Sequence, residues 1–387
     1  MRGGMRGGRP RRGRGGGAPG LGLGGPVGGG QMRLQNAGKI PFDLTYFDDI
    51  FPRVGPVPDD STLNAMILKR NSDISPSTDE IQIVQNLVTR VVGIIETLIL
   101  TPGAFDACQV DEVRQIGSFK QGTILAGHKT ADFVVILRTL PTKEAVEALC
   151  TRISEELKQT ECVRTTITPR GFDITSVQAC VRILITTVPH NFRKLDADLH
   201  LDSKLMNEAW QAIRHSRWFE ENAHNSTIKV LIRILRDMRQ RYSGFQSLAT
   251  WMLDLLAHYA TLNNPTRQAL PVNVAFRRTL SLMSGGMYLP GYAGTNIRGH
   301  SLTYEEEDAA TSTAQTLLRI LSHGGYKYVL GLEIPPNDII TSPTVIDGVV
   351  ISPLEKVYEA MPEDEKIYDE EEANEDDEGD ANMEPEN

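Results

Sequence analysis

Cysteine is scarce in this chain of 387 residues, whose only cysteines are Cys108, Cys150, Cys162 and Cys180. No two of them form a C-x-x-C pair, and no histidine stands at the spacing of a zinc finger, so a structural zinc site is not expected. Isolated thiols of this kind are typical of a reduced, intracellular protein.

Long apolar runs are also missing. No run approaches the roughly 20 residues that a membrane-spanning helix needs, and glycine and arginine stand where a signal peptide has its apolar segment. We therefore expect no membrane partner. The length allows one large domain or two medium ones with a buried core.

Acidic residues are missing from the N-terminal end of the chain, and basic residues are almost missing from the C-terminal end. Residues 1–38 contain seven Arg and no acidic residue, whereas residues 361–387 contain 14 acidic residues and one Lys. Neither segment has enough apolar residues to offset the entropy of ordering. We expect a disordered Arg-Gly-rich head at 1–38 and a disordered acidic tail at 356–387.

The Arg-Gly repeats of the head predict contact with RNA, because arginine pairs with phosphates and stacks on bases while glycine keeps the backbone adaptable. The candidate RNA-binding residues are Arg2, Arg6, Arg9, Arg11, Arg12 and Arg14. A solubilising or import-signal role is the alternative. For the acidic tail we favour solubility over competition with nucleic acid for basic surfaces.

Between the tails the pattern predicts an α/β lobe at 39–200 and an all-helical lobe at 201–355. Ser77-x-x-Glu80 is a capping box, and apolar residues at helical spacing behind it predict a helix near 78–100. Strands are expected at 112–117, 132–140, 172–177 and 180–188, with a helix around 146–157. Later helices are expected near 203–222, 226–242, 247–262, 272–285 and 307–323.

The main functional signal is the Gly117-Ser118 turn after the first strand, followed by Asp132 at the start of the second. Glycine and a hydroxyl at such a turn let backbone N–H groups approach phosphate closely. Gly122 and Thr123 complete the candidate phosphate cradle. On the residues alone an ordinary turn is the alternative, because Gly-Ser turns are common.

The same layout is typical of a nucleotidyltransferase site, where carboxylates hold divalent metal. Two acids at i and i+2 on a strand project to one face, and a third usually comes from a neighbouring strand. Here Thr130 stands two residues before Asp132, and the candidate third strand, 181–188, contains no Asp or Glu. We therefore expect no metal ligands and no catalytic residues.

Longer strings carry a family resemblance. Ile116-Gly-Ser, Gly122-Thr and Ala131-Asp132 before an apolar strand resemble the oligoadenylate synthetases of the nucleotidyltransferase superfamily. The segments 212–222, 263–268 and 320–325 resemble the DZF domain (domain associated with zinc fingers), and the resemblance covers essentially the whole chain. It implies a nucleotidyltransferase-like mixed-sheet lobe followed by an all-helical lobe, in a subunit that has lost catalysis.

The resemblance also implies a set of ligand contacts. Arg236 matches a triphosphate-contacting lysine, while Thr250 and Trp251 match residues that hold the nucleotide. No cofactor is required, and a weakly bound nucleoside triphosphate with Mg²⁺ is the implied ligand. The implied nucleotide-binding set is Gly117, Ser118, Asp132, Arg236, Thr250 and Trp251.

The implied partner is a larger DZF protein with double-stranded-RNA-binding domains or zinc fingers, held through the helical lobe. Proteins of the interleukin enhancer-binding factor three type, spermatid perinuclear RNA-binding protein and zinc-finger RNA-binding protein fit that description. Double-stranded RNA would be bound mainly through the partner. The implied roles are transcription regulation, with DNA binding, and RNA metabolism, in the nucleus and nucleolus with a cytoplasmic fraction.

Apolar residues around Gly285-Gly286 and within 317–330 suit either partner docking or an ordinary helical core. Lys229, Arg233, Arg236 and Gln240 share one face of a predicted helix. That face is either a phosphate contact or a solvated face on which Arg233 pairs with Asp237.

A possible metal cluster lies just before the helical lobe, in the alternating residues Asp196, Asp198, His200 and Asp202. We favour an ordinary polar face, because nothing nearby completes a metal site. An active template-free nucleotidyltransferase could instead draw on the acids at 305–308, but no strand places them opposite Asp132. A sequence-specific DNA-binding transcription factor is a further alternative, although no helix-turn-helix or finger pattern supports it.

Overall fold

The computed structural model describes residues 43–46, 60–286, 302–355 and 357–358. The candidate RNA-binding arginines and nearly all of the acidic tail lie outside these residues, so the expectations for both ends stay predictions. The described residues form a mixed α/β part followed by a mainly helical part, as the sequence predicts.

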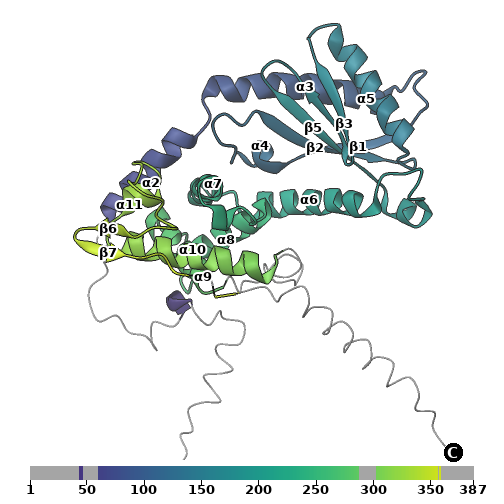
Figure 1. The fold of residues 1–387 in the computed structure, drawn as a ribbon. Coiled ribbons are helices and arrows are strands. Elements are labelled where there is room, and N and C mark those ends of the chain that lie inside the picture. Colours follow the sequence, from purple (N-terminus) through teal and green to yellow (C-terminus); the bar gives the residue numbers. More distant parts are fainter. Residues whose placement is uncertain (1–42, 47–59, 287–301, 356, 359–387) are drawn as a thin grey trace, which may run out of the picture. The chain divides into compact units, whose positions relative to one another are not determined.

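The α/β part contains one sheet with helices on both faces (Figure 1). The first described elements are the 3-10 helix η1 (Leu44–Tyr46) and α2 (Ser61–Ile74), and the buried residues of α2 belong to the core of the helical part. The elements of the α/β part are α3 (Thr78–Leu100), β1 (Val110–Ile116), α4 (Gly117–Gln121), β2 (Thr130–Leu137), α5 (Lys143–Lys158), β3 (Arg164–Thr168), β4 (Gly171–Thr175), β5 (Cys180–Thr187), the 3-10 helix η2 (Pro189–Lys194) and α6 (Ser203–Asn222).

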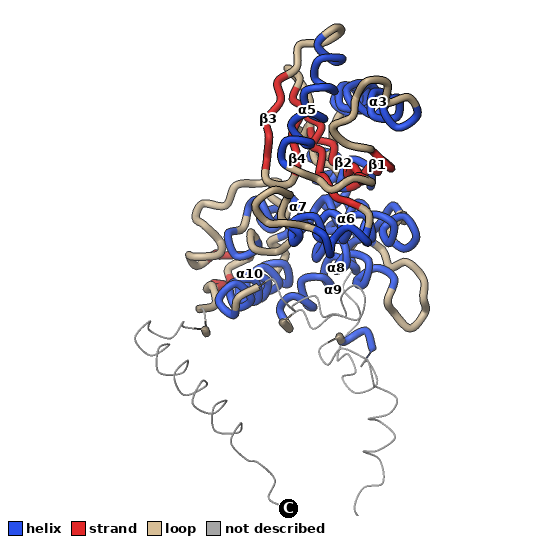
Figure 2. Tube along the Cα trace, turned by 90° about the vertical axis from the view of Figure 1, so that its right-hand side faces the viewer, coloured by secondary structure: helices blue, strands red, loops and turns tan. Residues whose placement is uncertain are grey.

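The five strands lie in the order β1-β2-β5-β4-β3. Strands β2 and β5 are parallel, and every other neighbouring pair is antiparallel. Alternate residues of β2 point to opposite faces: Phe133 and Val135 join the core beneath α3 and α5, whereas Val134 and Ile136 pack against α6. Figure 2 shows the strands between these helices. Asp132 therefore lies on the α6 side of the sheet.

The capping box predicted at the start of α3 is present. The Ser77 hydroxyl accepts the Glu80 N–H at 3.2 Å, and the Glu80 carboxylate accepts the Ser77 N–H at 2.9 Å. By length and composition alone, α3 is also apolar enough to cross a membrane, which the sequence pattern did not indicate. It carries Arg90 and Glu96, and its buried residues belong to the core between the sheet and helices α3 and α5.

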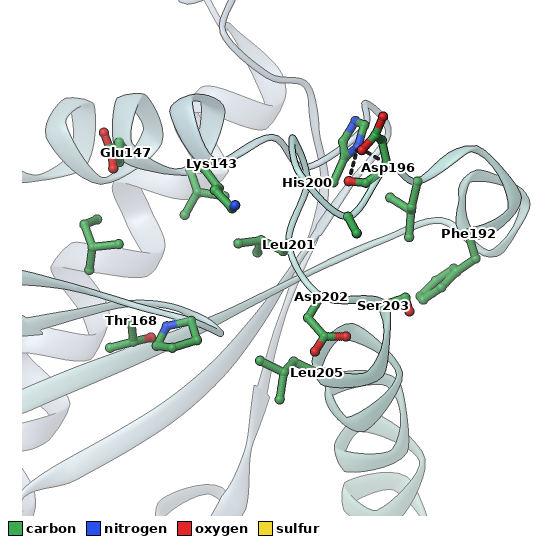
Figure 3. A pocket seen from close by; sticks show the side chains of 15 residues that line it. Lys143, Glu147, Thr168, Phe192, Asp196, His200, Leu201, Asp202, Ser203 and Leu205 are labelled. Carbon is green, nitrogen blue, oxygen red and sulfur yellow. Dashed lines mark hydrogen bonds between the residues drawn. The ribbon is translucent and has the colours of Figure 1, made fainter.

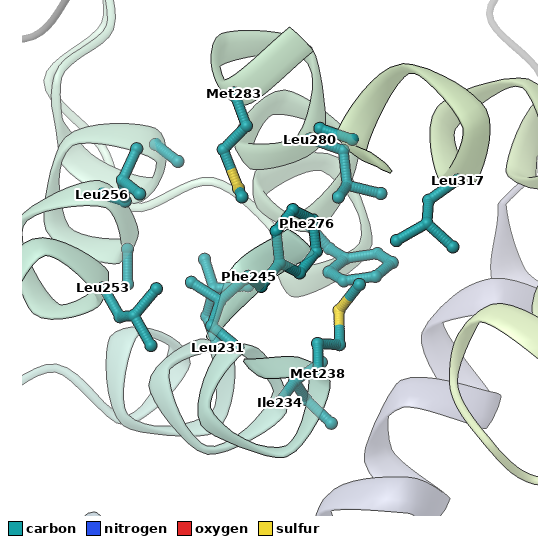
Figure 4. Close-up of a cluster of buried hydrophobic side chains, with 14 of the residues drawn as sticks. Leu231, Ile234, Met238, Phe245, Leu253, Leu256, Phe276, Leu280, Met283 and Leu317 are labelled. Atoms are coloured by element: carbon teal, nitrogen blue, oxygen red, sulfur yellow. The ribbon is translucent and has the colours of Figure 1, made fainter. Parts of the chain in front are cut away.

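The helical part contains α7 (Ser226–Arg241), the 3-10 helix η3 (Ser243–Phe245), α8 (Thr250–Leu262), α9 (Val272–Ser284), α10 (Tyr304–Ser322), α11 (Tyr326–Val329) and a hairpin of β6 (Thr344–Ile346) and β7 (Val349–Ile351). Figure 4 shows its core, in which Phe245, Phe276 and Met238 meet leucines from α7, α8, α9 and α10. Leu282, Met283, Leu317, Leu321 and Leu330 are buried there, so these candidate docking residues are core residues.

Several elements have no counterpart in the sequence prediction. Strand β3 reads RTTIT and lies at the edge of the sheet, where Ile167 is exposed, so no apolar alternation marks it. Helix α2 buries only Leu63, Ile67 and Ile74 and has a weak apolar stripe. The β6–β7 hairpin is too short for a period-2 pattern to stand out.

Candidate functional site

The predicted Gly-Ser turn lies at the junction of β1 and α4. Gly117 has φ +74°, a conformation that favours glycine. A Cβ at this position would lie 2.8 Å from Oδ2 of Asp132, because β1 and β2 pair Ile116 with Asp132. Two features therefore favour glycine at position 117: the positive φ of the backbone and the close approach of the Asp132 carboxylate.

Helix α4 closes immediately behind the turn. Gly122 ends it in the left-handed conformation, with φ +68°, and the Thr123 N–H donates to the Ser118 carbonyl at 2.9 Å. Thr123 is fully buried, and its hydroxyl accepts from Arg236 at 2.9 Å. Thr123 thus makes internal contacts, whereas Gly117 and Ser118 are partly exposed and Gly122 is exposed.

Asp132 belongs to a row of charged side chains across three strands. It is the direct neighbour of Arg182 on β5, and Arg182 is the direct neighbour of Asp173 on β4. Such neighbours project to the same face of a sheet. Arg182 donates from Nε and Nη2 to Asp173 at 3.2 and 3.4 Å, and its Nη1 lies 3.9 Å from Asp132 Oδ1.

The electrostatics of the row follow from this arrangement. Burial raises the pKa of the Asp132 carboxyl most strongly, the Arg182 guanidinium lowers it, and the Asp173 carboxylate raises it further. The hydrogen bond to Asp173 raises the pKa of Arg182 above its ordinary value. The row therefore holds one permanent cation between two carboxylates.

Neither Thr130 on β2 nor the adjacent strand β5 places a second carboxylate directly beside Asp132. Thr130, two residues earlier on β2, lies opposite Cys180. On the Asp132 side of β5 stand Cys180, Arg182 and Leu184, so the strand expected beside β2 is in place and carries no acid. Among the described residues, no three His, Cys, Asp or Glu side chains gather to hold a metal ion.

A pocket of ≈ 580 Å³ opens at this row. Gly117, Asp132, Asp173 and Arg182 line it, together with Arg170 from the β3–β4 turn and further residues. Sequence reasoning missed Arg182 and Asp173 as site residues. The alternation of buried Phe172 and Ile174 around Asp173 was the available signal for which face Asp173 occupies.

Arg236, the predicted triphosphate contact, is held in a buried network. Its guanidinium donates to Asp254 on α8 at 2.9 Å and to Gln121 on α4 at 3.3 Å, in addition to Thr123. Asp254 is 1 % exposed and also lies 2.9 Å from His215 on α6. Arg236 therefore ties α4, α7 and α8 together, and its contact with a nucleotide stays a prediction.

The remaining predicted nucleotide contacts lie on α8. Thr250 is the first residue of that helix and is exposed, while Trp251 is half-buried against the helical core. Asp254 lies one turn after Thr250 on the same helix, and its ion pair with Arg236 connects this helix to α4. Their contact with nucleotide is untested.

The basic stripe of α7 packs against the segment that follows the turn. Arg233 donates to the Gly122 carbonyl at 2.7 Å and to Asn71 at 3.0 Å, and Gln240 lies 2.9 Å from His128. Asp237 instead binds Arg70 and Arg241, so the expected Arg233–Asp237 pair is wrong. Arg233 and Arg236 therefore face other parts of the protein rather than solvent, and a phosphate contact of the stripe stays a prediction.

A second pocket, of ≈ 830 Å³, contains part of the alternating acidic segment (Figure 3). The backbone N–H of Asp196 donates to Nδ1 of His200 at 2.9 Å. The Asp202 carboxylate caps α6 by accepting the Lys204 N–H at 2.7 Å. Asp196 itself accepts the Asp198 N–H at 3.0 Å. These contacts stabilise turns and a helix start, so the favoured polar-face interpretation fits the structure.

The acids at 305–308 lie in the first turns of α10. Glu306 forms a capping box with Thr303, and Asp308 accepts the Val357 and Tyr358 N–H groups at 2.8 and 3.2 Å. Their placement on a helix start of the helical part, rather than on a strand of the sheet, does not bring them to the Asp132 row.

Two family models match the chain, one after the other. The DZF N-terminal domain matches residues 32–224, and the DZF C-terminal domain matches residues 227–352. These models divide the chain after α6, so the five-stranded sheet and α6 fall in the first domain, and α7 begins the second, which also holds the β6–β7 hairpin. The sequence prediction placed its lobe boundary at 200/201, before α6.

Solved structures of nucleotidyltransferases resemble the fold at low sequence identity. The Cid1 RNA terminal uridylyl transferase has a TM-score of 0.50 and 10% identity, over 70% of this chain and 98% of that chain. The E. coli MS115-1 CdnC in complex with HORMA-deltaN has a TM-score of 0.47 and 14% identity, over 70% of this chain and 93% of that chain. The fold is accordingly nucleotidyltransferase-like.

Proposed function

Because the chain belongs to the DZF family, we propose that it is a non-catalytic nucleotidyltransferase-like subunit that pairs with a larger DZF protein. That partner carries double-stranded-RNA-binding domains or zinc fingers and binds the RNA. The subunit stabilises the partner and acts with it in transcription regulation and RNA metabolism, in the nucleus with a cytoplasmic fraction.

The observation that carries the absence of catalysis is the Asp132–Arg182–Asp173 row. Nucleotide transfer needs divalent metal to activate a hydroxyl and to neutralise phosphate charge. Mg²⁺ prefers several carboxylate and water oxygens in near-octahedral order. At this position one carboxylate faces a guanidinium 3.9 Å away, and Thr130 stands two residues before it. This donor set does not fit a metal pair.

Nucleotide binding without transfer is the second part of the proposal. The pocket of ≈ 580 Å³ retains Gly117 at its wall, and the Gly117 conformation keeps the α4 backbone close to Asp132. We place a weakly bound nucleoside triphosphate there, in contact with Gly117, Ser118 and Asp132. It serves as a structural ligand rather than a substrate.

Pairing is supported by apolar surface in the C-terminal domain. Val345 and Val350 are cross-strand neighbours in the β6–β7 hairpin and are 61% and 62% exposed, and Ile334 is 96% exposed. A two-stranded hairpin also offers unpaired backbone groups along its edges. Apolar side chains and open edges of this kind fit a protein partner whose own surface is apolar.

The catalytic part is tested with the purified heterodimer, Mg²⁺, each of the four ribonucleoside triphosphates and a labelled RNA primer. We expect no primer extension. Extension that disappears in an Asp132→Ala variant would overturn the proposal, because the activity would then depend on this pocket. Extension that persists in that variant would indicate a contaminating polymerase and is checked against a mock purification.

The pairing part is tested by co-expression with the larger DZF protein and co-purification through a tag on that partner. We expect Val350→Glu to reduce recovery of the complex by about tenfold or more, because it places a charge in an apolar interface. Val177→Glu is the matched control, since Val177 is 89% exposed in the turn between β4 and β5. Equal recovery of both variants would show that the hairpin is not part of the interface.

A further inference from the structure

The Asp132–Arg182–Asp173 row has a cation built into the protein where a metal-dependent enzyme has carboxylates for a bound ion. Arg182 is 50% exposed at its side chain, whereas Asp132 and Asp173 are 26% and 21% exposed. The guanidinium is therefore the most accessible group of the row, and it lines the pocket of ≈ 580 Å³ together with Gly117.

A divalent cation does not fit beside this guanidinium. An ion bound to Asp132 would lie within a few ångströms of a permanent positive charge and would have a single carboxylate to compensate it. The Coulomb repulsion and the shortage of oxygen ligands act in the same direction. The pocket thus disfavours the ion that normally carries triphosphate into a nucleotidyltransferase site.

Arg182 still has donors to offer. Its Nε and one Nη2 hydrogen contact Asp173, which leaves three of the five guanidinium N–H groups. Within the described parts of the chain, these three have no hydrogen-bond acceptor, since Asp132 Oδ1 at 3.9 Å is beyond hydrogen-bond range. The planar fork of arginine matches phosphate oxygens, so free donors at a pocket wall are suited to a phosphate.

We propose that Arg182 replaces the divalent metal in this pocket, so that a nucleoside triphosphate is bound through its phosphates by the guanidinium without a metal ion. Asp173 holds the guanidinium through two hydrogen bonds and also places a negative charge beside the proposed phosphate site. Arg170, held by Glu208 at 2.7 Å, adds a second cation to the lining. The inference rests on the nucleotide binding proposed above and specifies its chemistry.

The experiment titrates the full-length chain with ATP, CTP, GTP and UTP in separate calorimetric runs, once with excess Mg²⁺ and once with excess EDTA. The variants are Arg182→Ala, Arg182→Lys and Asp173→Asn. Arg152→Ala is the matched control, since Arg152 is an exposed arginine of α5 that pairs only with Glu156 among the described residues. Thermal unfolding by circular dichroism verifies that each variant is folded.

We expect the affinity in EDTA to equal or exceed the affinity in Mg²⁺, because the metal competes with Arg182 for phosphate oxygens. Arg182→Ala should weaken binding by about tenfold or more, since charged hydrogen bonds are lost. Arg182→Lys should retain part of the affinity, because lysine keeps the charge but not the fork. Asp173→Asn should tighten binding, since it removes a negative charge and frees donors. Arg152→Ala should bind as the wild type does.

The possible failures are distinguishable. Binding that is present in Mg²⁺ and lost in EDTA overturns the metal-free mode and leaves the proposed nucleotide binding in place. Unchanged binding in Arg182→Ala likewise overturns the role of Arg182, and indicates another anion site such as the Arg-rich head. If no triphosphate binds under either condition, the nucleotide part of the proposed function fails along with this inference. Should Arg182→Ala not fold, the Asp173→Asn result decides, since weaker binding there contradicts the proposal.

Discussion

Gly117 and Asp132 constrain each other at the scale of single residues. The carboxylate occupies the space that any side chain at position 117 would need, 2.8 Å from the place of a Cβ. The turn, in return, holds Asp132 in a partly buried position that raises the pKa of its carboxyl. Local conformation and local electrostatics are therefore coupled in two residues that lie 15 positions apart.

A Gly117→Ala variant should lose more stability than a Gly122→Ala variant. Both glycines have positive φ, which alone costs an alanine about 1–2 kcal/mol. A Cβ at 122 meets only Lys229 Nζ at 3.7 Å, an ordinary contact, whereas a Cβ at 117 clashes with Asp132. We expect about 1 kcal/mol for Gly122→Ala and about 2–4 kcal/mol for Gly117→Ala, measured by urea unfolding.

The double variant Gly117→Ala with Asp132→Ala separates the two contributions, because it removes the carboxylate and keeps the strained φ. We expect it to be more stable than Gly117→Ala alone. Equal losses in the two glycine variants would show that steric contact with Asp132 does not limit residue 117.

An Asp132→Asn variant should be more stable than the wild type at neutral pH. The folded-state pKa of Asp132 lies above its unfolded value, because burial penalises the charged form. The penalty is fully present above the folded pKa and disappears as the pH falls below the unfolded pKa. The variant should gain stability near pH 7, and the gain should vanish in acid. Chemical unfolding at several pH values tests this, and a variant that is less stable at pH 7 would contradict it.

At the scale of elements, Arg236 connects three helices that are distant in the sequence. Its guanidinium contacts Gln121 and Thr123 at the end of α4 and Asp254 on α8. His215 of α6 reaches the second oxygen of Asp254. The buried Arg236 thus attaches the segment behind the pocket to the helical domain, together with the contacts of Arg233 and Gln240.

Arg236→Ala should destabilise the fold by about 3–5 kcal/mol, because it leaves Asp254 buried without its arginine. The matched control is Arg217→Ala, whose ion pair with Glu221 is exposed and should contribute less than about 0.5 kcal/mol. Thermal unfolding followed by circular dichroism compares the two. A loss for Arg236→Ala as small as that for the control would show that Asp254 finds another partner.

Most elements could be predicted from local sequence signals, whereas contacts between distant segments could not. The Ser77–Glu80 capping box and the apolar spacing behind it lie within one helix, so the sequence predicts α3 with its correct bounds. The Arg182–Asp173 pair depends on the register between β4 and β5, which hydrophobic alternation leaves open for the solvent-side face. The buried contacts of Arg236 likewise depend on packing between distant segments.

At the scale of the whole molecule, charge is segregated at the two ends of the chain. Seven arginines stand within residues 1–38, and 14 acidic residues within 361–387. Attraction between oppositely charged segments weakens with salt, as does attraction of the basic head to nucleic acid. Any RNA contact made by the head should therefore be the salt-sensitive part of RNA binding.

Removal of residues 1–38 should weaken RNA binding and reduce its salt dependence. Each arginine–phosphate contact contributes about 0.7–0.9 to the slope of log affinity against log salt, so loss of six contacts lowers that slope by about 4–5. Binding of a labelled RNA measured by anisotropy over a salt series tests this. Removal of residues 361–387 is the control and should not lower the affinity for RNA. If the slope of log affinity against log salt is unchanged without residues 1–38, the head has a role other than RNA binding.

The charged row at the pocket also determines what a metal site at this position would require. Thr130→Asp alone would add a carboxylate next to Asp132 and leave the guanidinium of Arg182 where a cation would bind. Loss of Arg182 alone would leave Asp132 and Asp173 without their shared counter-ion. Either single substitution carries an electrostatic penalty before any metal can bind, so at least two changes must arrive together. No single substitution of these two kinds would therefore create a metal site in this pocket.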